Sequence, residues 1–208
     1  TPLGLIALLL SLGLAIDGKN VLLGASPLRD KLGQPIAGPG LTIVDDPFIE
    51  YGLHTAAFDD EGTPCKVTPL IEKGVLRNFI YDRDTAGRAG VKPTGHGSNR
   101  RLTNLVIESG DVPFKTMLAD IKQGLLVHNF LGLGQGNPIN GEFSVNVCLG
   151  YKIENGELVG RVKDVMLAGN AFDALKSITA ISKERERGYG VYSLMPYVQI
   201  GSMSVTAK

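Results

Sequence analysis

The hydrophobic pattern of the chain begins with an almost uninterrupted apolar run, Leu3 to Ile16. The run is shorter than the roughly 20 residues that a membrane-spanning helix needs, and it lacks the basic n-region and cleavage site of a signal peptide. It therefore predicts a helix buried in the protein or at an interface, with a role at a membrane as the alternative. Because the chain starts at Thr1, we expect residues 1–40 to be an apolar helix and linker that remain from a truncated N-terminal half.

Residues 41–208 read mainly as strands joined by tight turns. Lys73-Gly74 separates two β-rich runs and indicates a hairpin. Asn155-Gly156 is the strongest short hairpin signal in the chain. The predicted strands are Asn20 to Leu23, Leu41 to Val44, Lys66 to Glu72, Val75 to Tyr81, Leu125 to Phe130, Glu142 to Glu154, Glu157 to Arg161 and Tyr197 to Thr206.

Three further segments have helical patterns. Asp82 to Ala89 has helical composition, and Pro113 starts a helix whose apolar side chains recur at helical spacing. Ala171 to about Arg185 is predicted as the third helix, from the apolar stripe Phe172, Leu175, Ile178 and Ile181. Strands and helices do not alternate regularly, so we predict an α+β fold. It would be a largely antiparallel, barrel-like sheet with about three helices packed on it, formed by residues 41–208.

Composition narrows the possible functions. Lys plus Arg and Asp plus Glu both number 21, so the overall charge does not favour binding to nucleic acid or to an anionic membrane. The two cysteines form no CxxC pair, which favours a reducing, cytoplasmic setting. Cys148 lies between apolar strand neighbours and is expected to be buried, whereas Cys65 beside Pro64 is expected to be more reachable.

The three histidines do not form a metal motif. None begins HExxH or HExxxH, so no helix here offers two imidazoles on one face to a metal. We interpret His54 and His128 as structural residues. His96 lies in the polar loop Thr94 to Arg101, and the candidates for ligand or peptide contact in this loop are His96, Asn99 and Arg100.

The glycine-rich stretch Leu131 to Gly141 could present backbone N–H groups to an anion. A phosphate-binding loop would lead into a helix, but this stretch leads into another strand. We therefore predict a β-to-β loop whose glycines supply positive φ, with peptide or ligand contact as the alternative. The candidates for such contact are Gly134, Gln135, Gly136, Asn137 and Asn140.

Two acidic clusters, Asp45-Asp46 and Asp59 to Glu61, could form a carboxylate acid/base pair or a site for a hard metal ion. Turn chemistry explains them better, because Asp59 to Gly62 has the composition of a turn between β-rich segments. The charged run Lys183 to Arg187 reads as the solvated end of the third helix.

Together these segments resemble one family, the TldD/PmbA proteins, which have been labelled modulators of DNA gyrase and are peptidase subunits. The order and spacing of the matching segments hold over nearly the whole chain. They are LTIVDDP at Leu41 to Pro47, FDDEGTP at Phe58 to Pro64, LIEKGVLRNFIYDRDTAGRAGVKPTGHG at Leu70 to Gly97, GLLVHNFLGLGQGNPINGEFS at Gly124 to Ser144, YKIENGE at Tyr151 to Glu157 and VMLAGN at Val165 to Asn170.

The resemblance implies that residues 41–208 are the C-terminal domain of such a protein. Zinc-binding members of the family carry HExxxH in their N-terminal part and a cysteine near the C-terminal end. No Cys follows Cys148, and the segment Gly188 to Pro196 stands where that cysteine would be expected. The chain therefore resembles the PmbA (TldE) type, which lacks the metal site.

What the resemblance implies is a non-catalytic subunit of an intracellular heterodimeric metalloprotease that acts on unstructured peptides and in peptide maturation. Zinc would be held by a TldD-type partner, with self-association as the alternative, and no metal or catalytic residue would lie on this chain. Two other classes stay open. One is a peptide-binding or scaffold module with no protease role, and the other is an enzyme that uses His96 or Cys65 directly.

Overall fold

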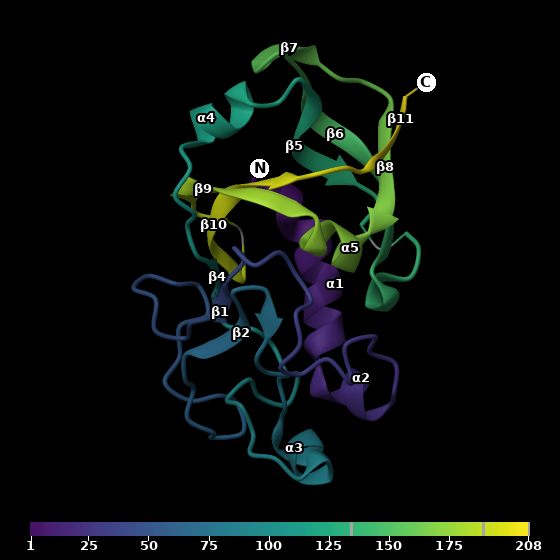
Figure 1. Ribbon diagram of the computed structural model, residues 1–208. Helices are drawn as coiled ribbons and strands as arrows, with labels where there is room; N and C mark the ends of the chain where they lie inside the picture. Colours follow the sequence, from purple (N-terminus) through teal and green to yellow (C-terminus); the bar gives the residue numbers. More distant parts are fainter. Residues whose placement is uncertain (134, 189, 208) are drawn as a thin grey trace.

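An apolar helix lies between the two sheets of the molecule (Figure 1). In a computed structural model, which describes residues 1–133, 135–188 and 190–207, the first turn is the 3₁₀ helix η1 (Leu3–Leu5), followed by α1 (Ile6–Ile16). Leu12 and Ile16 are buried in the larger hydrophobic core, whereas Ala7 belongs to a second, smaller core. The predicted buried helix is thus confirmed, and it contributes to both cores.

The lower sheet in Figure 1 has the strand order β3-β2-β1-β4-β10-β9 among the described residues. Neighbouring strands are antiparallel except for β4 and β10, which run parallel. The strands are β1 (Ile43–Asp45), β2 (Thr68–Glu72), β3 (Val75–Leu76), β4 (Leu105–Ile107), β9 (Ile178–Glu186) and β10 (Tyr192–Ile200).

The upper sheet has the order β11-β8-β6-β5, and β7 pairs with the C-terminal half of β6. Its side chains Val145, Val147 and Leu167 form the smaller core with Ala7 of α1. The chain passes from the lower to the upper sheet between β10 and β11. The strands are β5 (Gln123–Leu131), β6 (Glu142–Glu154), β7 (Glu157–Arg161), β8 (Val165–Asn170) and β11 (Ser204–Ala207).

Four short helices complete the fold, namely α2 (Gly18–Leu22), α3 (Arg83–Ala89), α4 (Phe114–Ala119) and α5 (Ala171–Lys176). Local capping explains where they begin. Asp82 and Thr85 form a capping box at the start of α3, and Asn170 accepts hydrogen bonds from two backbone N–H groups at the start of α5. A further single turn, η2 (Pro138–Asn140), lies in the loop between β5 and β6.

Both predicted hairpins are confirmed. Asn155 and Gly156 have φ of 49° and 83°, and Lys73 and Gly74 have φ of 49° and 80°. Positive φ at both central residues is the backbone of a two-residue turn whose twist matches the flanking strands. The β6 and β7 bounds match the predicted ones.

The helix predicted over Ala171 to Arg185 is wrong beyond Lys176. The helix α5 ends at Ser177, whose hydroxyl donates to the carbonyl of Ala174 at 3.0 Å, and residues from Ile178 onward form strand β9 along β10. The four residues of the predicted stripe do face one core, but two come from a helix and two from a strand. The β-branched residues after Ser177 favour the strand, and pairing with β10 outweighs the helical spacing.

Three smaller predictions also need correction. The predicted strand at Asn20 to Leu23 is part of α2, because Asp17 accepts from the backbone N–H of Lys19 and caps a helix there. The single final strand is two strands, β10 and β11, because the chain changes sheets between them. The charged run Lys183 to Arg187 is exposed as expected, but it lies at the end of β9 and not of a helix.

The predicted α+β class and the mainly antiparallel pairing are confirmed, and five short α-helices are present in the described part of the chain. In place of one barrel-like sheet the fold has two separate sheets, which do not close into a barrel within the described ranges. Among these residues, no helix is both long and apolar enough to cross a membrane.

Leu12→Ala tests whether α1 is an integral part of the core. Leu12 is 1% exposed, so its truncation should lower the free energy of unfolding by about 2–5 kcal/mol through lost burial and the cavity left behind. Leu23→Ala is the matched control, because Leu23 is 71% exposed and its loss should change stability by less than about 0.5 kcal/mol. Urea unfolding measures both, and equal effects would contradict this assignment.

Candidate functional site

The polar loop Thr94 to Arg101, here called the anchored loop, is fixed to the lower sheet through His96. The His96 ring places Nε2 3.1 Å from Asp45 Oδ2 and Nδ1 2.9 Å from Thr94 Oγ1. Asp45 also accepts from the backbone N–H of Thr103 at 2.8 Å and from its hydroxyl at 2.7 Å. The Asp45 carboxyl group thus joins the His96 ring and Thr103 in one buried set of hydrogen bonds.

The second acidic cluster fixes the next residues of the anchored loop. Asp59 Oδ2 accepts from the backbone N–H of Gly97 at 2.8 Å. Asp60 accepts from the backbone N–H of Ser98 at 2.8 Å and from its hydroxyl at 2.6 Å, and these bonds lower the pKa of the Asp60 carboxyl. The acidic turn is thus present as predicted, and its carboxylates also serve as acceptors for a distant loop.

Arg100 closes the anchored loop against two helix N-termini. Its Nε donates to Asp17 Oδ1 at 2.6 Å, and its Nη1 donates to Asp82 Oδ2. Burial by itself would raise the pKa of the Asp82 carboxyl, but hydrogen bonds from Thr85 and Arg100 outweigh burial, and the net shift lowers the pKa.

These contacts leave much of the anchored loop buried. His96 is 5% exposed, and the Arg100 side chain is mostly buried between its two carboxylates. Of the three candidates in this loop, only Asn99 is classed as exposed. Carboxylates outside the loop bind these side chains and hold them against the protein. The sequence does not show that these carboxylates converge on the loop. The roles of these three residues in ligand contact stay predictions.

The glycine-rich stretch is a loop between β5 and β6, as predicted, and Gly132, Gly136 and Gly141 have positive φ. Gly134 lies outside the described residues. Gln135, Gly136, Asn137 and Asn140 are exposed, and the carbonyl of Asn140 accepts from the Asn170 amide at 2.8 Å. Their contact with a peptide stays a prediction. The described bonds of this loop go to β6 and to the turn before α5, so they do not join it to the anchored loop.

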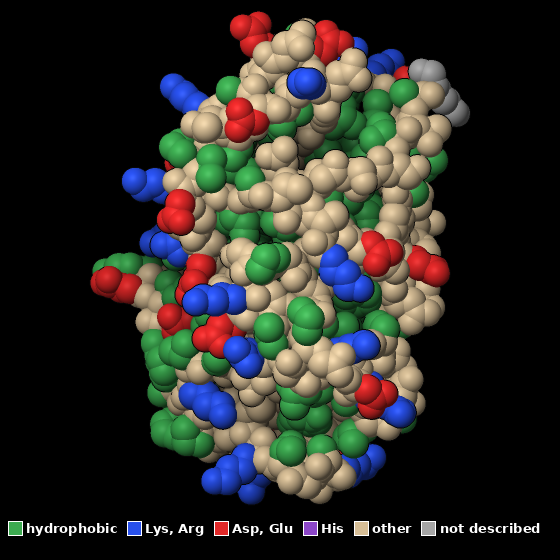
Figure 2. Space-filling view, in the orientation of Figure 1, with side chains coloured by type: hydrophobic (Ala, Val, Ile, Leu, Met, Phe, Trp, Pro, Cys, Tyr) green, Lys and Arg blue, Asp and Glu red, His purple; other side chains and the backbone are tan. Residues whose placement is uncertain are grey.

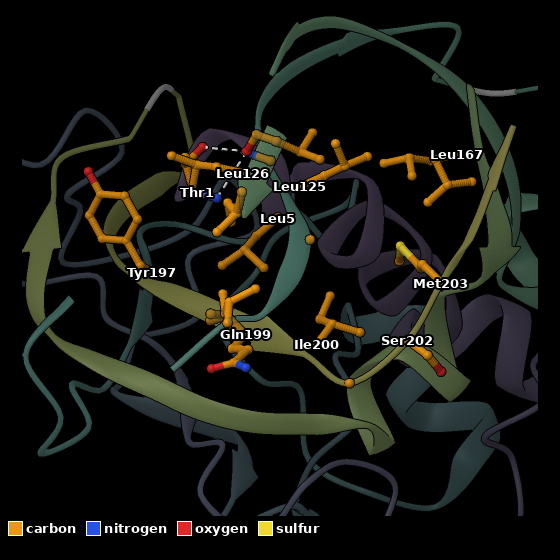
Figure 3. A pocket seen from close by; sticks show the side chains of 18 of the residues that line it. Thr1, Leu5, Leu125, Leu126, Leu167, Tyr197, Gln199, Ile200, Ser202 and Met203 are labelled. Carbon is orange, nitrogen blue, oxygen red and sulfur yellow. Dashed lines mark hydrogen bonds between the residues drawn. The ribbon is translucent and has the colours of Figure 1, made fainter. Parts of the chain in front are cut away.

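An apolar pocket of about 410 Å³, which no pattern in the sequence indicated, opens between the two sheets. In Figure 3, Leu125 and Leu126 of β5 lie opposite Ile200 and the segment after β10, with Leu5 between them. Met117 of α4 also lines the pocket. The apolar run Leu125 to Val127 in β5 is typical of a covered strand, but the sequence could not show that the two sheets leave a gap there.

Polar groups stand at one end of this apolar pocket. Tyr197 stacks on Phe114 with ring centroids 4.0 Å apart, and its hydroxyl donates to Glu186. Burial and this bond to a carboxylate raise the pKa of Tyr197 to about 12, so the phenol is neutral at physiological pH. An apolar cavity with a few polar groups at its edge suits an apolar side chain or a small apolar ligand.

The expected exposures of the two cysteines are reversed. Cys65 is buried, and its thiol donates to the carbonyl of Gly95 at 3.3 Å, whereas Cys148 is exposed. The alternation of β6 explains the second result, because Val145 and Val147 face the core and place Cys148 on the other face. Burial, with a smaller effect of nearby carboxylates, raises the pKa of the Cys65 thiol, which disfavours the reactive thiolate.

A zinc site does not fit the described residues of this chain. Within residues 1–133, 135–188 and 190–207, no three or more His, Cys, Asp or Glu side chains gather in a way that could hold a metal ion. His96 and Asp45 are in contact, but their remaining polar partners are threonines.

Comparison with known proteins identifies the family. The sequence profile of the PmbA/TldA metallopeptidase C-terminal domain matches residues 4–207. A protein named metalloprotease from Methanothermobacter thermautotrophicus is 34% identical over 187 residues, which cover 86% of this chain and 41% of that protein. The chain thus spans about two fifths of the length of this relative. It belongs to the PmbA/TldD family of metalloprotease-named proteins.

Solved structures agree with this assignment. A proposed modulator of a DNA gyrase from Thermotoga maritima has a TM-score of 0.86 and 33% identity, with 92% of this chain and 45% of that one covered. TldE from Thermococcus kodakarensis also has a TM-score of 0.86, with 29% identity and coverage of 93% and 46%. The fold is therefore that of the C-terminal part of these proteins.

Asp82→Asn tests the carboxylate anchoring through its pH dependence. The pKa of Asp82 is lowered in the folded protein, so its stabilising effect is present above the unfolded pKa near 3.8 and is lost as pH falls through the folded value. At pH 7 the variant should be less stable by about 1–3 kcal/mol, and the gap to the wild type should shrink below about pH 4. Urea unfolding from pH 7 to pH 3 measures it, with exposed Asp30→Asn as control. A gap that does not change with pH would contradict the anchoring.

Replacing Leu125 and Ile200 together with Trp tests the apolar pocket, because the two bulky rings would enter it from opposite sides. The affinity for an apolar fluorescent probe such as anilinonaphthalene sulfonate should fall at least about fivefold. Leu131→Trp is the control, because Leu131 lies on the same strand β5 but is 63% exposed and does not line the pocket. Equal probe affinity in both variants would show that the pocket does not bind the probe.

Proposed function

We propose that this chain is the C-terminal domain of a subunit of an intracellular heterodimeric metalloprotease, and that the zinc is held by the other subunit. The observation that carries the proposal is the combination of family membership with the sequence of the last third of the chain. Residues 149–208 contain no Cys, so this part lacks the cysteine that the zinc-binding members carry near the C-terminal end.

The segment in which that ligand would be expected, Gly188 to Pro196, has structural contacts instead. From Tyr192 onward it forms β10, which pairs with β4 and β9. Met195 is fully buried in the core, and the hydroxyl of Ser193 donates to Asn104 Oδ1 at 3.2 Å. These contacts support a structural role for this segment in place of zinc binding.

The proposed substrate is an unstructured peptide. The apolar pocket, with walls that include β5, β10 and the segment between β10 and β11, has the size and chemistry to take a large apolar side chain of such a peptide. The glycine-rich loop and Asn99 are the exposed polar candidates for contact with the peptide backbone. This subunit would thus bind and orient the peptide, and the other subunit would hydrolyse it.

The geometry gives less support to an enzyme that uses His96 or Cys65 directly. Both side chains are buried, and both have hydrogen-bond partners within the chain. The raised pKa of Cys65 leaves a smaller fraction of thiolate at neutral pH. A nucleophile needs access to substrate and an activating base, and neither is evident at these two residues.

Zinc content and peptide cleavage by the whole protein test the proposal. The protein is assayed alone and mixed with a zinc-binding family member, with an unstructured peptide as substrate. We expect zinc and cleavage only in the mixture, and cleavage should disappear when the glutamate of the partner's HExxxH is replaced by Gln. Stoichiometric zinc and cleavage by this protein alone would contradict the proposal.

A further inference from the structure

The segment Asp46 to Ala57, here called the apolar loop, presents large apolar side chains to solvent. Phe48 is 55% exposed, Leu53 is 75% exposed and Tyr51 is 85% exposed. The loop follows β1, and Figure 1 shows this part of the chain projecting sideways from the lower sheet. In Figure 2, hydrophobic side chains gather on the same flank of the molecule. Single exposed apolar residues are common, but three large ones on one projecting loop, two of them aromatic, are characteristic of an interaction surface.

The backbone of the apolar loop is fixed from inside by Asn104, which is completely buried. Its amide nitrogen donates to the carbonyl of Asp46 at 3.0 Å and lies 3.2 Å from Thr55 Oγ1. Its Oδ1 accepts from the backbone N–H of His54 at 3.3 Å and from Ser193. One buried side chain thus ties both ends of the apolar loop to the sheet.

The tip of the loop is equally constrained. A Cβ on Gly52 would lie 2.7 Å from Asn104 Oδ1 and from Thr55 Oγ1, so only glycine fits there. Tyr51 has a φ of 58°, a conformation that L side chains rarely adopt. Thr55 Oγ1 donates to the carbonyl of Ile49 at 2.7 Å and closes the tip. The chain therefore holds Tyr51 in a strained backbone conformation, although the ring of Tyr51 is exposed and does not pack in the core.

We infer that the apolar loop is a docking surface for a second protein chain, and that this chain is the other subunit of the proposed heterodimer. Tyr, like Trp and Arg, is among the residue types that contribute most to the binding free energy of protein interfaces, and Tyr51 is the most exposed residue of the three. A loop already fixed by Asn104 loses little conformational entropy when a partner binds. The identity of the partner rests on the proposed function, whereas the docking surface rests on the loop alone.

Charge around the apolar loop favours a protein over a membrane. Residues 32–65 contain no Lys or Arg, and the loop itself carries Asp46 and Glu50. Arg101 contacts the loop through His54 Nε2 at 2.9 Å. An acidic apolar tip is repelled by anionic lipid, which attracts basic segments. It suits a protein surface with an apolar recess and basic side chains around it.

The test uses the whole protein with three substitutions in the apolar loop, Phe48→Ser, Tyr51→Asn and Leu53→Ser. Asn is chosen at position 51 because it tolerates positive φ. The matched control carries Leu23→Ser and Leu32→Ser, two apolar residues that are 71% and 54% exposed elsewhere on the surface. Thermal unfolding confirms that all variants are folded. The Kd for a zinc-binding family member is then measured by isothermal titration calorimetry.

We expect the Kd of the loop variant to rise at least about 30-fold, and the control to bind like the wild type. Wild-type affinity in the loop variant would overturn the inference, as would loop-dependent binding to phosphatidylserine vesicles. If the wild type does not bind the family member, its self-association is measured in the same variants. Loop-dependent self-association would then contradict the proposed heterodimer but support the loop as a docking surface. If the wild type associates neither with the family member nor with itself, both the heterodimer and the docking surface are overturned.

Discussion

Burial of the apolar helix α1 is the constraint on which the rest of the structure depends. Its side chains pack into the core of the lower sheet, and Ala7 near its start packs into the core of the upper sheet. Because one helix serves two cores, it determines how the two sheets lie relative to each other. The apolar pocket opens at the first turns of this helix, where Leu5 and Leu8 meet β5 and β10. The position of the pocket is thus a consequence of the packing of the helix.

A second constraint is that the lower part of the molecule uses acidic side chains as hydrogen-bond acceptors for its loops and helix ends. Asp45, Asp59, Asp60 and Asp82 each accept hydrogen bonds from loop backbone or from buried side chains. These bonds hold the anchored loop, and Asn104 holds the apolar loop in a comparable way. Buried polar groups are costly unless all their bonds are made, and within the described residues no buried side-chain nitrogen or oxygen lacks a partner. The two loops are therefore rigid parts of the surface.

Local signals in the sequence predicted the local structure well. The Asn155-Gly156 and Lys73-Gly74 turns and the capping of α3 depend on residues close in sequence, so they could be predicted. The strand β9 was predicted as a helix because its apolar spacing continued that of α5, and this spacing outweighed the β-branched residues that favour a strand and the pairing with β10 that the sequence does not show. The burial of His96 and the role of Asn104 depend on residues about 50 positions away. The candidate site residues Asn99 and Gln135 were predictable as loop residues, but the apolar pocket was not, because it forms between elements distant in sequence.

The chain belongs to a family named for metalloproteases, and the proposed role of this domain is to bind and position a peptide. The most direct test of this account is a crystal structure of the whole protein with a zinc-binding family member, with anomalous diffraction measured at the zinc edge. The account predicts one zinc per heterodimer, with every protein ligand on the other subunit and with Tyr51 of the apolar loop buried in the interface. A zinc ion bound by side chains of this protein would contradict it.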